Sequence, residues 1–171
     1  MHNDVTTRHV TVADIPAISQ LHKTVFGPGR FVRSAYRVRE GKGAHSRFCR
    51  LAQEATGRVI AALRLTPICI GGEPGAVLLG PIAVDPEFAG QGFGRRLINE
   101  ALEEMRAAGV SLVILVGDEP YYGRLGFKPA AIGQIAFPGP VNPARILACE
   151  LAEGAIARYR GLVAATAGQE T

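Results

Sequence analysis

Three glycines alternate with other residues directly before an apolar helical pattern: Gly90, Gly92 and Gly94. Such a loop has few side chains and can turn several backbone N–H groups outward at the start of a helix, which suits phosphate binding. Arg95 and Arg96 follow in the first helical turn, where the helix dipole disfavours cations by roughly 0.3–1 kcal/mol each unless an anion lies nearby. The pattern therefore indicates a phosphate ligand. A tight turn with solvated arginines, or an ion pair from Arg96 to the acid four residues later, explains the same residues without one.

Two common nucleotide-binding motifs do not fit this loop. A Walker loop ends in Gly-Lys-Ser or Gly-Lys-Thr, which is absent here. A Rossmann fingerprint has the spacing G-x-G-x-x-G after a first strand, whereas this loop has the spacing G-x-G-x-G after several expected strands. The phosphate ligand is therefore expected to be of another kind.

The loop lies within a pattern of strands and helices that predicts a mixed sheet. Apolar periodicity and Gly/Pro punctuation predict strands at 7–12, 48–54, 59–70, 76–84, 111–116, 127–137 and 145–151. They predict helices at 14–26, 30–40 and 95–108 and a short helix at 118–125. The strand before the loop, the helix after it and the continuously apolar strand 111–116 form a βαβ crossover. Gly80 and Pro81 indicate a bulge or an interruption in the strand before the loop, and an ordinary edge strand is the alternative.

Length and composition are typical of one globular domain. The chain has 171 residues, of which 47% are hydrophobic and 20% charged, which excludes a disordered or fibrous protein. No stretch approaches 18 consecutive apolar residues, and the N-terminus lacks the apolar core of a secretory signal. We therefore expect a soluble, cytoplasmic protein with no membrane partner.

Charge and cysteine content restrict the partners further. The net charge of +4 and the pI near 9.3 come almost wholly from arginine, which suits anions. No dense basic run with interleaved aromatic residues is present, so nucleic-acid binding is not expected. Cys49, Cys69 and Cys149 are widely spaced without a C-x-x-C pair, which favours buried free thiols over disulfides or a zinc site. No metal is expected.

The glycine loop resembles the signature of the GNAT superfamily of acyl-CoA-dependent N-acyltransferases, Q/R-x-x-G-x-G/A at a strand-to-helix turn. Here residues 89–94 carry it, with Ala89 in place of Gln or Arg, which removes one side-chain contact but leaves a backbone cradle. Three further stretches agree with the family: 82–86, 111–118 and 122–127, the last of which is similar to Tyr-x-x-Leu-Gly-Phe. This ordered agreement spans about residues 76–128.

The resemblance implies a fold and a ligand. The fold is α/β (α+β), a mixed, mostly antiparallel sheet of six to seven strands with a central parallel pair that splays apart, flanked by about four helices. Residues 1–163 would form a single acyl-CoA N-acyltransferase domain, and a frayed tail is expected at 164–171, or from about Gly161 onward. The cosubstrate would be acetyl-CoA, with the pantetheine arm against the backbone of Ile82, Ala83 and Val84. Its pyrophosphate would lie against Gly90, Gln91, Gly92, Phe93, Gly94 and Arg95.

The resemblance also implies catalytic roles. Tyr122 matches the family's tyrosine general acid, although a half-buried packing role, or confusion with Tyr121, is the alternative. The general base is unassigned among Asp85, Glu87, Glu54, Glu73, His22 and His45, and capping of a turn is the favoured role of Asp85. The acceptor would enter near 27–43 and 127–143, where Arg30, Arg33 and Arg37 either face an acidic group or form a solvated helix face. Residues 135–140 form either an apolar acceptor wall or a rigid turn.

The sequence thus predicts an acetyl-CoA-dependent N-acetyltransferase that acts on the primary amine of a small molecule or peptide by direct attack in a ternary complex. Homodimers are common among proteins that it resembles. Ala89 and the missing base leave a non-catalytic acyl-CoA-binding sensor as one alternative. A nucleic-acid-associated basic domain, whose affinity would fall steeply with salt, is another.

Overall fold

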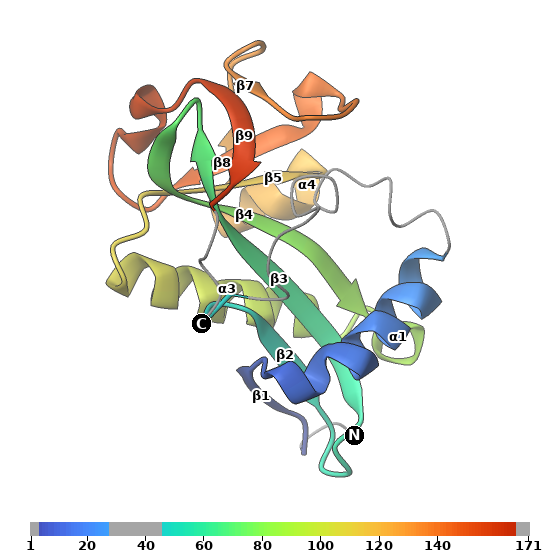
Figure 1. Ribbon diagram of the computed structural model, residues 1–171. Coiled ribbons are helices and arrows are strands. Elements are labelled where there is room, and N and C mark those ends of the chain that lie inside the picture. Colours follow the sequence, from blue (N-terminus) through green and yellow to red (C-terminus); the bar gives the residue numbers. More distant parts are fainter. Residues whose placement is uncertain (1–3, 28–45, 167–171) are drawn as a thin grey trace.

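A long antiparallel hairpin runs through the middle of the sheet in the computed structural model, which describes residues 4–27 and 46–166 (Figure 1). Strands β3 (Val59–Ile70) and β4 (Glu73–Val84) are each 12 residues long and are joined by Gly71 and Gly72. Both glycines have positive φ, 58° and 88°, as a two-residue type I′ turn requires. The predicted bounds of β3 are confirmed. Strand β4 begins three residues earlier than predicted, because two glycines suffice for the turn.

The remaining strands extend this hairpin on both sides. The sheet order is β1-β2-β3-β4-β5-β8-β6, with β9 also beside β3 and β7 beside β9. The further strands are β1 (Thr6–His9), β2 (Arg50–Gln53), β5 (Leu112–Val116), β6 (Lys128–Pro129), β7 (Ile135–Ala136), β8 (Ile146–Glu150) and β9 (Gly161–Ala165). Among the strands of the described residues, only β4–β5 and β7–β9 pair in parallel. The predicted mixed, mostly antiparallel sheet with a central parallel pair is confirmed, and the described residues form nine strands rather than six or seven.

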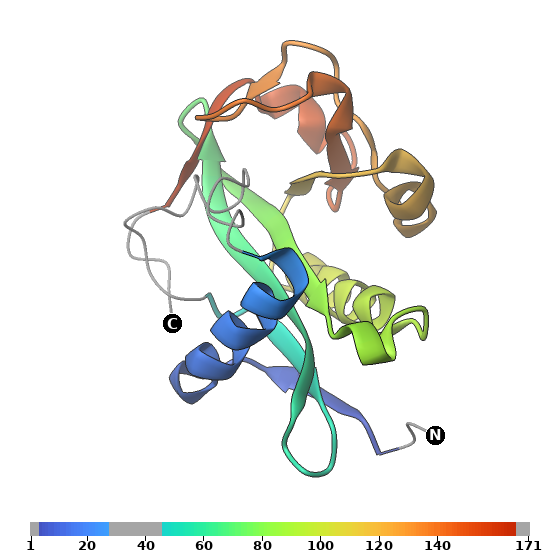
Figure 2. The same ribbon diagram turned by 90° about the vertical axis from the view of Figure 1, so that its right-hand side faces the viewer.

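Helices cover both faces of the sheet (Figure 2). Helix α1 (Ile15–Phe26) packs on the face that carries Ala62 and Ala83, whereas α3 (Phe93–Ala107) packs on the face that carries Leu63. The apolar side of α3 is buried in the largest core cluster, as its periodicity predicts: Leu97, Ile98, Ala101, Leu102 and Met105. A short helix α4 (Glu119–Tyr122) follows β5 and continues as a 3-10 turn. The helix predicted at 30–40 lies outside the described residues.

The two parallel strands separate part-way along their length. Among the described residues, β4 pairs with β5 only from Ala76 to Leu78. The register between β3 and β4 shifts just beyond this point, with Leu65 opposite Leu79 and Leu63 opposite Ile82, so Gly80 and Pro81 form the predicted bulge. The last residues of β4 therefore have β3 on one side and an open edge on the other.

Two predictions about the C-terminal third are wrong. The single strand predicted at 127–137 is two short strands, β6 and β7, because Pro129 cannot donate to a ladder and Gly133 turns the chain with φ of 86°. The frayed tail predicted from Gly161 is an ordered strand as far as Ala165. Strand β9 pairs with β3 and β7 and buries Val163, contacts that depend on residues distant in the sequence.

The three cysteines are free thiols in the structure. Cys49 and Cys149 are buried free thiols and Cys69 is half-buried. Burial raises the pKa of the Cys149 thiol, so this side chain is expected to react slowly with thiol reagents at neutral pH. Within residues 4–27 and 46–166, no helix is long and apolar enough to cross a membrane.

An ion pair ties the start of α1 to the first strand. Asp14 precedes α1 as predicted, but its carboxylate accepts hydrogen bonds from Arg8 (2.8 Å to each of two nitrogens) and from the backbone of Thr11 (2.8 Å) rather than from the helix. The guanidinium of Arg8 holds the pKa of Asp14 well below its usual range. A carboxyl with a depressed folded-state pKa stabilises the fold above its unfolded pKa of about 3.9 and loses that contribution as the pH falls.

We therefore expect Asp14→Asn to lower the free energy of unfolding at pH 7 by about 1–2 kcal/mol, since it breaks hydrogen bonds to a charged group. The difference from the original protein should shrink as the pH falls from about 4 toward 2. Urea denaturation at pH 7, 4 and 2.5 measures this difference in the free energy of unfolding. Asp118→Asn is the control, since the Asp118 side chain is 74% exposed and, within residues 4–27 and 46–166, bonds only to the exposed Arg145. An equal loss at every pH would contradict the ionic origin of the effect.

Candidate functional site

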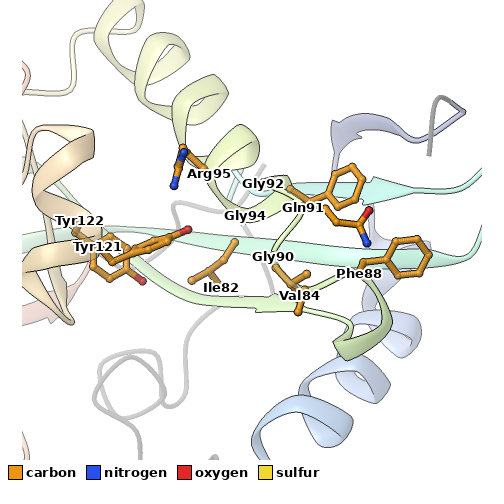
Figure 3. Close-up of a pocket in the computed structure, with 12 residues that line it drawn as sticks. Ile82, Val84, Phe88, Gly90, Gln91, Gly92, Gly94, Arg95, Tyr121 and Tyr122 are labelled. Atoms are coloured by element: carbon orange, nitrogen blue, oxygen red, sulfur yellow. The ribbon is translucent and has the colours of Figure 1, made fainter. Parts of the chain in front are cut away.

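A pocket of about 560 Å³ lies where β4 and β5 diverge, between β4, the start of α3 and α4 (Figure 3). Its lining comes from four pieces of structure: the end of β4, the turn after it, the first turn of α3, and α4. The lining residues are Ile82, Val84, Phe88, Ala89, Gly90, Gln91, Gly92, Phe93, Gly94, Arg95, Tyr121 and Tyr122. All of the predicted site residues except Ala83 therefore lie together in one pocket.

The glycine loop presents backbone amides to this pocket. Gly90 and Gly92 have φ of 78° and 86°, and a Cβ at either position would meet nothing within 4 Å, so the loop borders open space. The N–H of Arg96 bonds to the carbonyl of Gly92 (2.9 Å) as the first rung of α3. The preceding N–H groups of α3 have no intrahelical acceptor, and they lie at the positive end of the helix dipole. This end of the pocket is suited to an anion with several oxygens.

The open edge of β4 forms the second wall. The N–H of Asp85 bonds to Ile60 of β3 (2.8 Å). Successive residues of a strand direct their backbone groups to alternate sides, so those of Ile82 and Val84 face away from β3, toward the gap left by β5. Ala83 differs from its neighbours, since its side chain is buried in the cluster beneath α1 and its backbone faces β3. The edge therefore offers hydrogen bonds from alternate residues to an extended ligand.

Two adjacent tyrosines form the third wall, and both rings extend from α4 toward Ile82 in Figure 3. Their rings meet edge to face, with centroids 4.8 Å apart at 84°. Tyr122 is half-buried and also packs edge to face against Phe127. A Cβ built on Gly117, at the end of β5, would lie 2.5 Å from Cε2 of Tyr122. A glycine at position 117 thus makes room for the Tyr122 ring.

The two arginines of the first helical turn have different surroundings. Arg95 is exposed and lines the pocket, and none of the ion pairs among residues 4–27 and 46–166 involves it. Arg96 lies outside the pocket and pairs with Glu100 four residues later (3.3 Å). The ion pair with Glu100 accounts for Arg96 without a ligand. Arg95, in contrast, lies where it could bind an anion in the pocket.

None of the acidic residues and histidines proposed as bases that fall within the described residues lines this pocket. Asp85 caps the 3-10 turn after β4 by accepting from the N–H of Glu87 (2.9 Å), and it also bonds Arg58 (2.8 Å). Hydrogen bonds to Asp85 and Glu87 raise the pKa of Arg58, so these charges are mutually satisfied. Glu54 and Glu73 lie near the turns at either end of β3, and His22 is a buried residue of α1. His45, like the three arginines predicted on a helix face, lies outside the described residues.

The pocket combines an open strand edge, an amide-lined helix start and tyrosine hydroxyls, as the sequence resemblance implies. The comparison with known families decides the family assignment. Residues 6–130 match the family described as acetyltransferase (GNAT) domain. The chain belongs to the GNAT family of acetyltransferases. The glycine loop and α3 fall well inside the matched segment.

Individual GNAT relatives support the assignment. The N-acetyltransferase YhbS of Escherichia coli is 32% identical over 66% of this chain and 68% of its own length, and YjhQ of the same organism is 31% identical over 78% and 75%. The crystal structure of YhbS in complex with CoA superposes with a TM-score of 0.80 at 27% identity, covering 95% of this chain and 90% of that one. A GNAT acetyltransferase from Brucella melitensis in complex with acetyl-CoA has a TM-score of 0.61 at 29% identity, covering 91% and 99%.

Sequence reasoning missed three features of this GNAT pocket. Phe88 and Tyr121 line it, and Gly117 makes room for one of its tyrosines. A large apolar residue inside the polar turn 85–92 was the available signal for Phe88, which is buried against Phe93. Nothing in the local sequence distinguishes Gly117 from a glycine that merely ends a strand.

Proposed function

We propose that this chain is an acetyl-CoA-dependent N-acetyltransferase that transfers the acetyl group to a primary amine by direct attack in a ternary complex. One observation carries the proposal: a single pocket combines the open edge of β4, the amide-lined start of α3 and the Tyr122 side chain. The crystal structures of YhbS with CoA and of the Brucella relative with acetyl-CoA support the choice of cosubstrate. Residues 1–163 would act as one catalytic domain, and the acceptor would be a small molecule or peptide.

The residues of this pocket fit the parts of acetyl-CoA. The amides and φ-positive glycines of residues 90–94, together with Arg95, would bind the diphosphate. The backbone groups of Ile82 and Val84 would bind the pantetheine amides, and one donor aimed at the thioester oxygen would stabilise the charge that develops there, an effect usually worth ~3 kcal/mol. Ala89 contributes no polar side chain, so binding would rest on the backbone and Arg95.

The transfer forms one bond and breaks another. The neutral amine attacks the thioester carbon, a C–N bond forms and the C–S bond breaks. The hydroxyl of Tyr122 would give its proton to the departing thiolate, and the amine nitrogen would lose a proton to water or to a base. None of the described residues that line the pocket is Asp, Glu or His. That observation favours an amine that binds already deprotonated, or a proton path through water.

The same observation favours a second candidate, a protein that binds acyl-CoA as a sensor without turnover. The two functions differ in the products formed, because only an enzyme releases free thiol when acetyl-CoA and an amine are supplied. A screen of small-molecule and peptide amines with thiol detection separates them. Thiol release that depends on the amine supports the enzyme, and tight binding without release from any amine supports the sensor.

The first test is the thermal unfolding midpoint with and without acetyl-CoA, with dephospho-CoA and ATP as comparison ligands. A ligand at 100 times its dissociation constant stabilises the folded state by about 2.7 kcal/mol. For a chain of this size that raises the midpoint by several degrees. A rise that is largest with acetyl-CoA supports the proposal. A folded protein whose midpoint does not move would refute the cosubstrate assignment.

Arg95 and Arg96 offer a matched pair of variants. We expect Arg95→Ala to raise the dissociation constant of CoA about five- to tenfold, since one exposed charge-assisted contact to the diphosphate is lost. Arg96→Ala removes the same charge from the adjacent position, yet its side chain pairs with Glu100 outside the pocket, so affinity should change less than twofold. Titration calorimetry at 50 and 200 mM salt measures both. Equal losses for the two variants would show only a general effect of net charge.

A further inference from the structure

Tyr121 lies next to the proposed general acid, Tyr122, and has no role in the proposed reaction. Tyr121 is 42% exposed at the mouth of the pocket, in α4, and its ring is nearly perpendicular to that of Tyr122. The two side chains therefore present their hydroxyls to different parts of the pocket, and Figure 3 shows both rings reaching from α4 toward β4. Among the described residues, no hydrogen bond involves the Tyr121 hydroxyl.

The Tyr121 hydroxyl reaches the first turn of α3. A Cβ built on Gly94 would lie 3.6 Å from Oη of Tyr121, 3.5 Å from Cγ2 of Val84 and 3.7 Å from Cγ1 of Ile82. The hydroxyl of an α4 residue, the open edge of β4 and the start of α3 thus converge on one point. Since Gly94 has no side chain, the Tyr121 hydroxyl can lie this close to the backbone of the first turn of α3.

Besides the apolar side chains of Ile82 and Val84, the pocket has hydrogen-bond donors on two walls near that point. The first backbone amides of α3 and the guanidinium of Arg95 donate hydrogen bonds and carry positive charge or partial charge, and the phenolic hydroxyl of Tyr121 can add one more donor from the opposite wall. A ligand group held from two sides by donors must carry several acceptor oxygens. The part of acetyl-CoA with this chemistry is the diphosphate, and the adjoining arm would then run along Ile82 and Val84.

We infer that Tyr121 is a further binding residue of this site, whose hydroxyl donates a hydrogen bond to the diphosphate of CoA where the pantetheine arm begins. The inference rests on the proposed function, since it assigns a contact to the proposed cosubstrate. It gives the two adjacent tyrosines separate tasks: Tyr121 binds the diphosphate and Tyr122 protonates the thiolate. The GNAT signature has Gln or Arg at the position of Ala89, which offers no polar side chain to CoA. Tyr121 would supply a side-chain contact to CoA from α4 instead.

Tyr121→Phe removes only the hydroxyl oxygen from an exposed ring, so the variant is expected to keep the original unfolding midpoint. We expect its dissociation constants for CoA and dephospho-CoA to rise by the same factor, about tenfold, which is near the low end for the loss of one hydrogen bond to a charged group because Tyr121 is partly exposed. The affinity for adenosine 3′-phosphate 5′-diphosphate, which keeps the diphosphate but lacks the arm, should fall by a similar factor. Tyr122→Phe is the matched control and should change CoA affinity less than twofold.

The outcomes of calorimetric titration separate this inference from the proposed function. Unchanged CoA affinity in Tyr121→Phe, with the unaltered protein binding CoA, would overturn the role of Tyr121 alone. A loss with CoA but not with dephospho-CoA would also overturn it, because the contact would then be to the 3′-phosphate. An unaltered protein that binds neither CoA nor acetyl-CoA would refute the proposed function itself.

Discussion

Replacing Tyr122 by Phe is expected to lower kcat by about 100-fold or more, because general acid catalysis by a positioned side chain contributes typically 10²–10⁴-fold. The affinity for CoA should stay within about twofold, since the ring remains packed against Phe127 and over Gly117. Thiol release at saturating acetyl-CoA, with an amine identified in the screen, measures kcat. Titration calorimetry measures the affinity.

Tyr159→Phe is the matched control for the loss of a tyrosine hydroxyl. Tyr159 is fully buried in the core cluster that also contains Ile70 and Leu112, and it does not line the pocket. Its hydroxyl donates a hydrogen bond to the carbonyl of Pro74 (2.7 Å). The variant should lower the unfolding midpoint, since the buried ring loses its hydrogen bond to Pro74, and should leave kcat unchanged because Tyr159 lies away from the pocket. If Tyr122→Phe retained the kcat of the unaltered protein, the thiolate would take its proton from water or another donor. Equal effects of both variants on kcat would indicate general destabilisation.

The elements around the pocket were predictable because their signals are local. The apolar run of strand β3 and the helical periodicity of α3 can each be recognised within 12 to 15 consecutive residues. The loop between β4 and α3 contains the glycine motif. Strand β9 was missed because its pairing with Ile68 and Ile70 depends on residues far away in the chain. The segment 127–137 was assigned as one strand because its apolar residues outweighed Pro129 and Gly133.

The same distinction applies within the pocket. Backbone cradles follow from glycine spacing, so the sequence predicted Gly90, Gly92 and Gly94 together. The position of the Tyr121 hydroxyl beside Gly94 depends on how α4 packs against the start of α3, which no local pattern encodes. Among the described residues, Ala83 is the one predicted CoA-binding residue that does not line the pocket. A run of three strand residues was predicted as one binding edge, although the alternation of a strand turns the middle residue to the other side.

The conformation of the glycine loop supplies the second large expected effect. Gly92 has φ of 86° and ψ of 7°, and it immediately precedes α3. A β-branched residue is rarely found in this left-handed region, and holding it there costs about 1–3 kcal/mol. We expect Gly92→Val to relieve that strain by moving the loop, which displaces two or three amide donors from the proposed diphosphate position. The dissociation constant of CoA should therefore rise about 100-fold.

Gly57→Val separates loss of the loop from loss of stability. Gly57 has φ of 93° in the exposed turn between β2 and β3, and a Cβ there meets nothing within 4 Å, as at Gly92. The backbone strain is thus equivalent, and both variants should lower the unfolding midpoint in the absence of ligand by similar amounts. Only Gly92→Val should lose CoA binding, because only its amides face the pocket. Retained affinity in Gly92→Val would mean that the side chains and the β4 edge, rather than the helix start, hold the ligand.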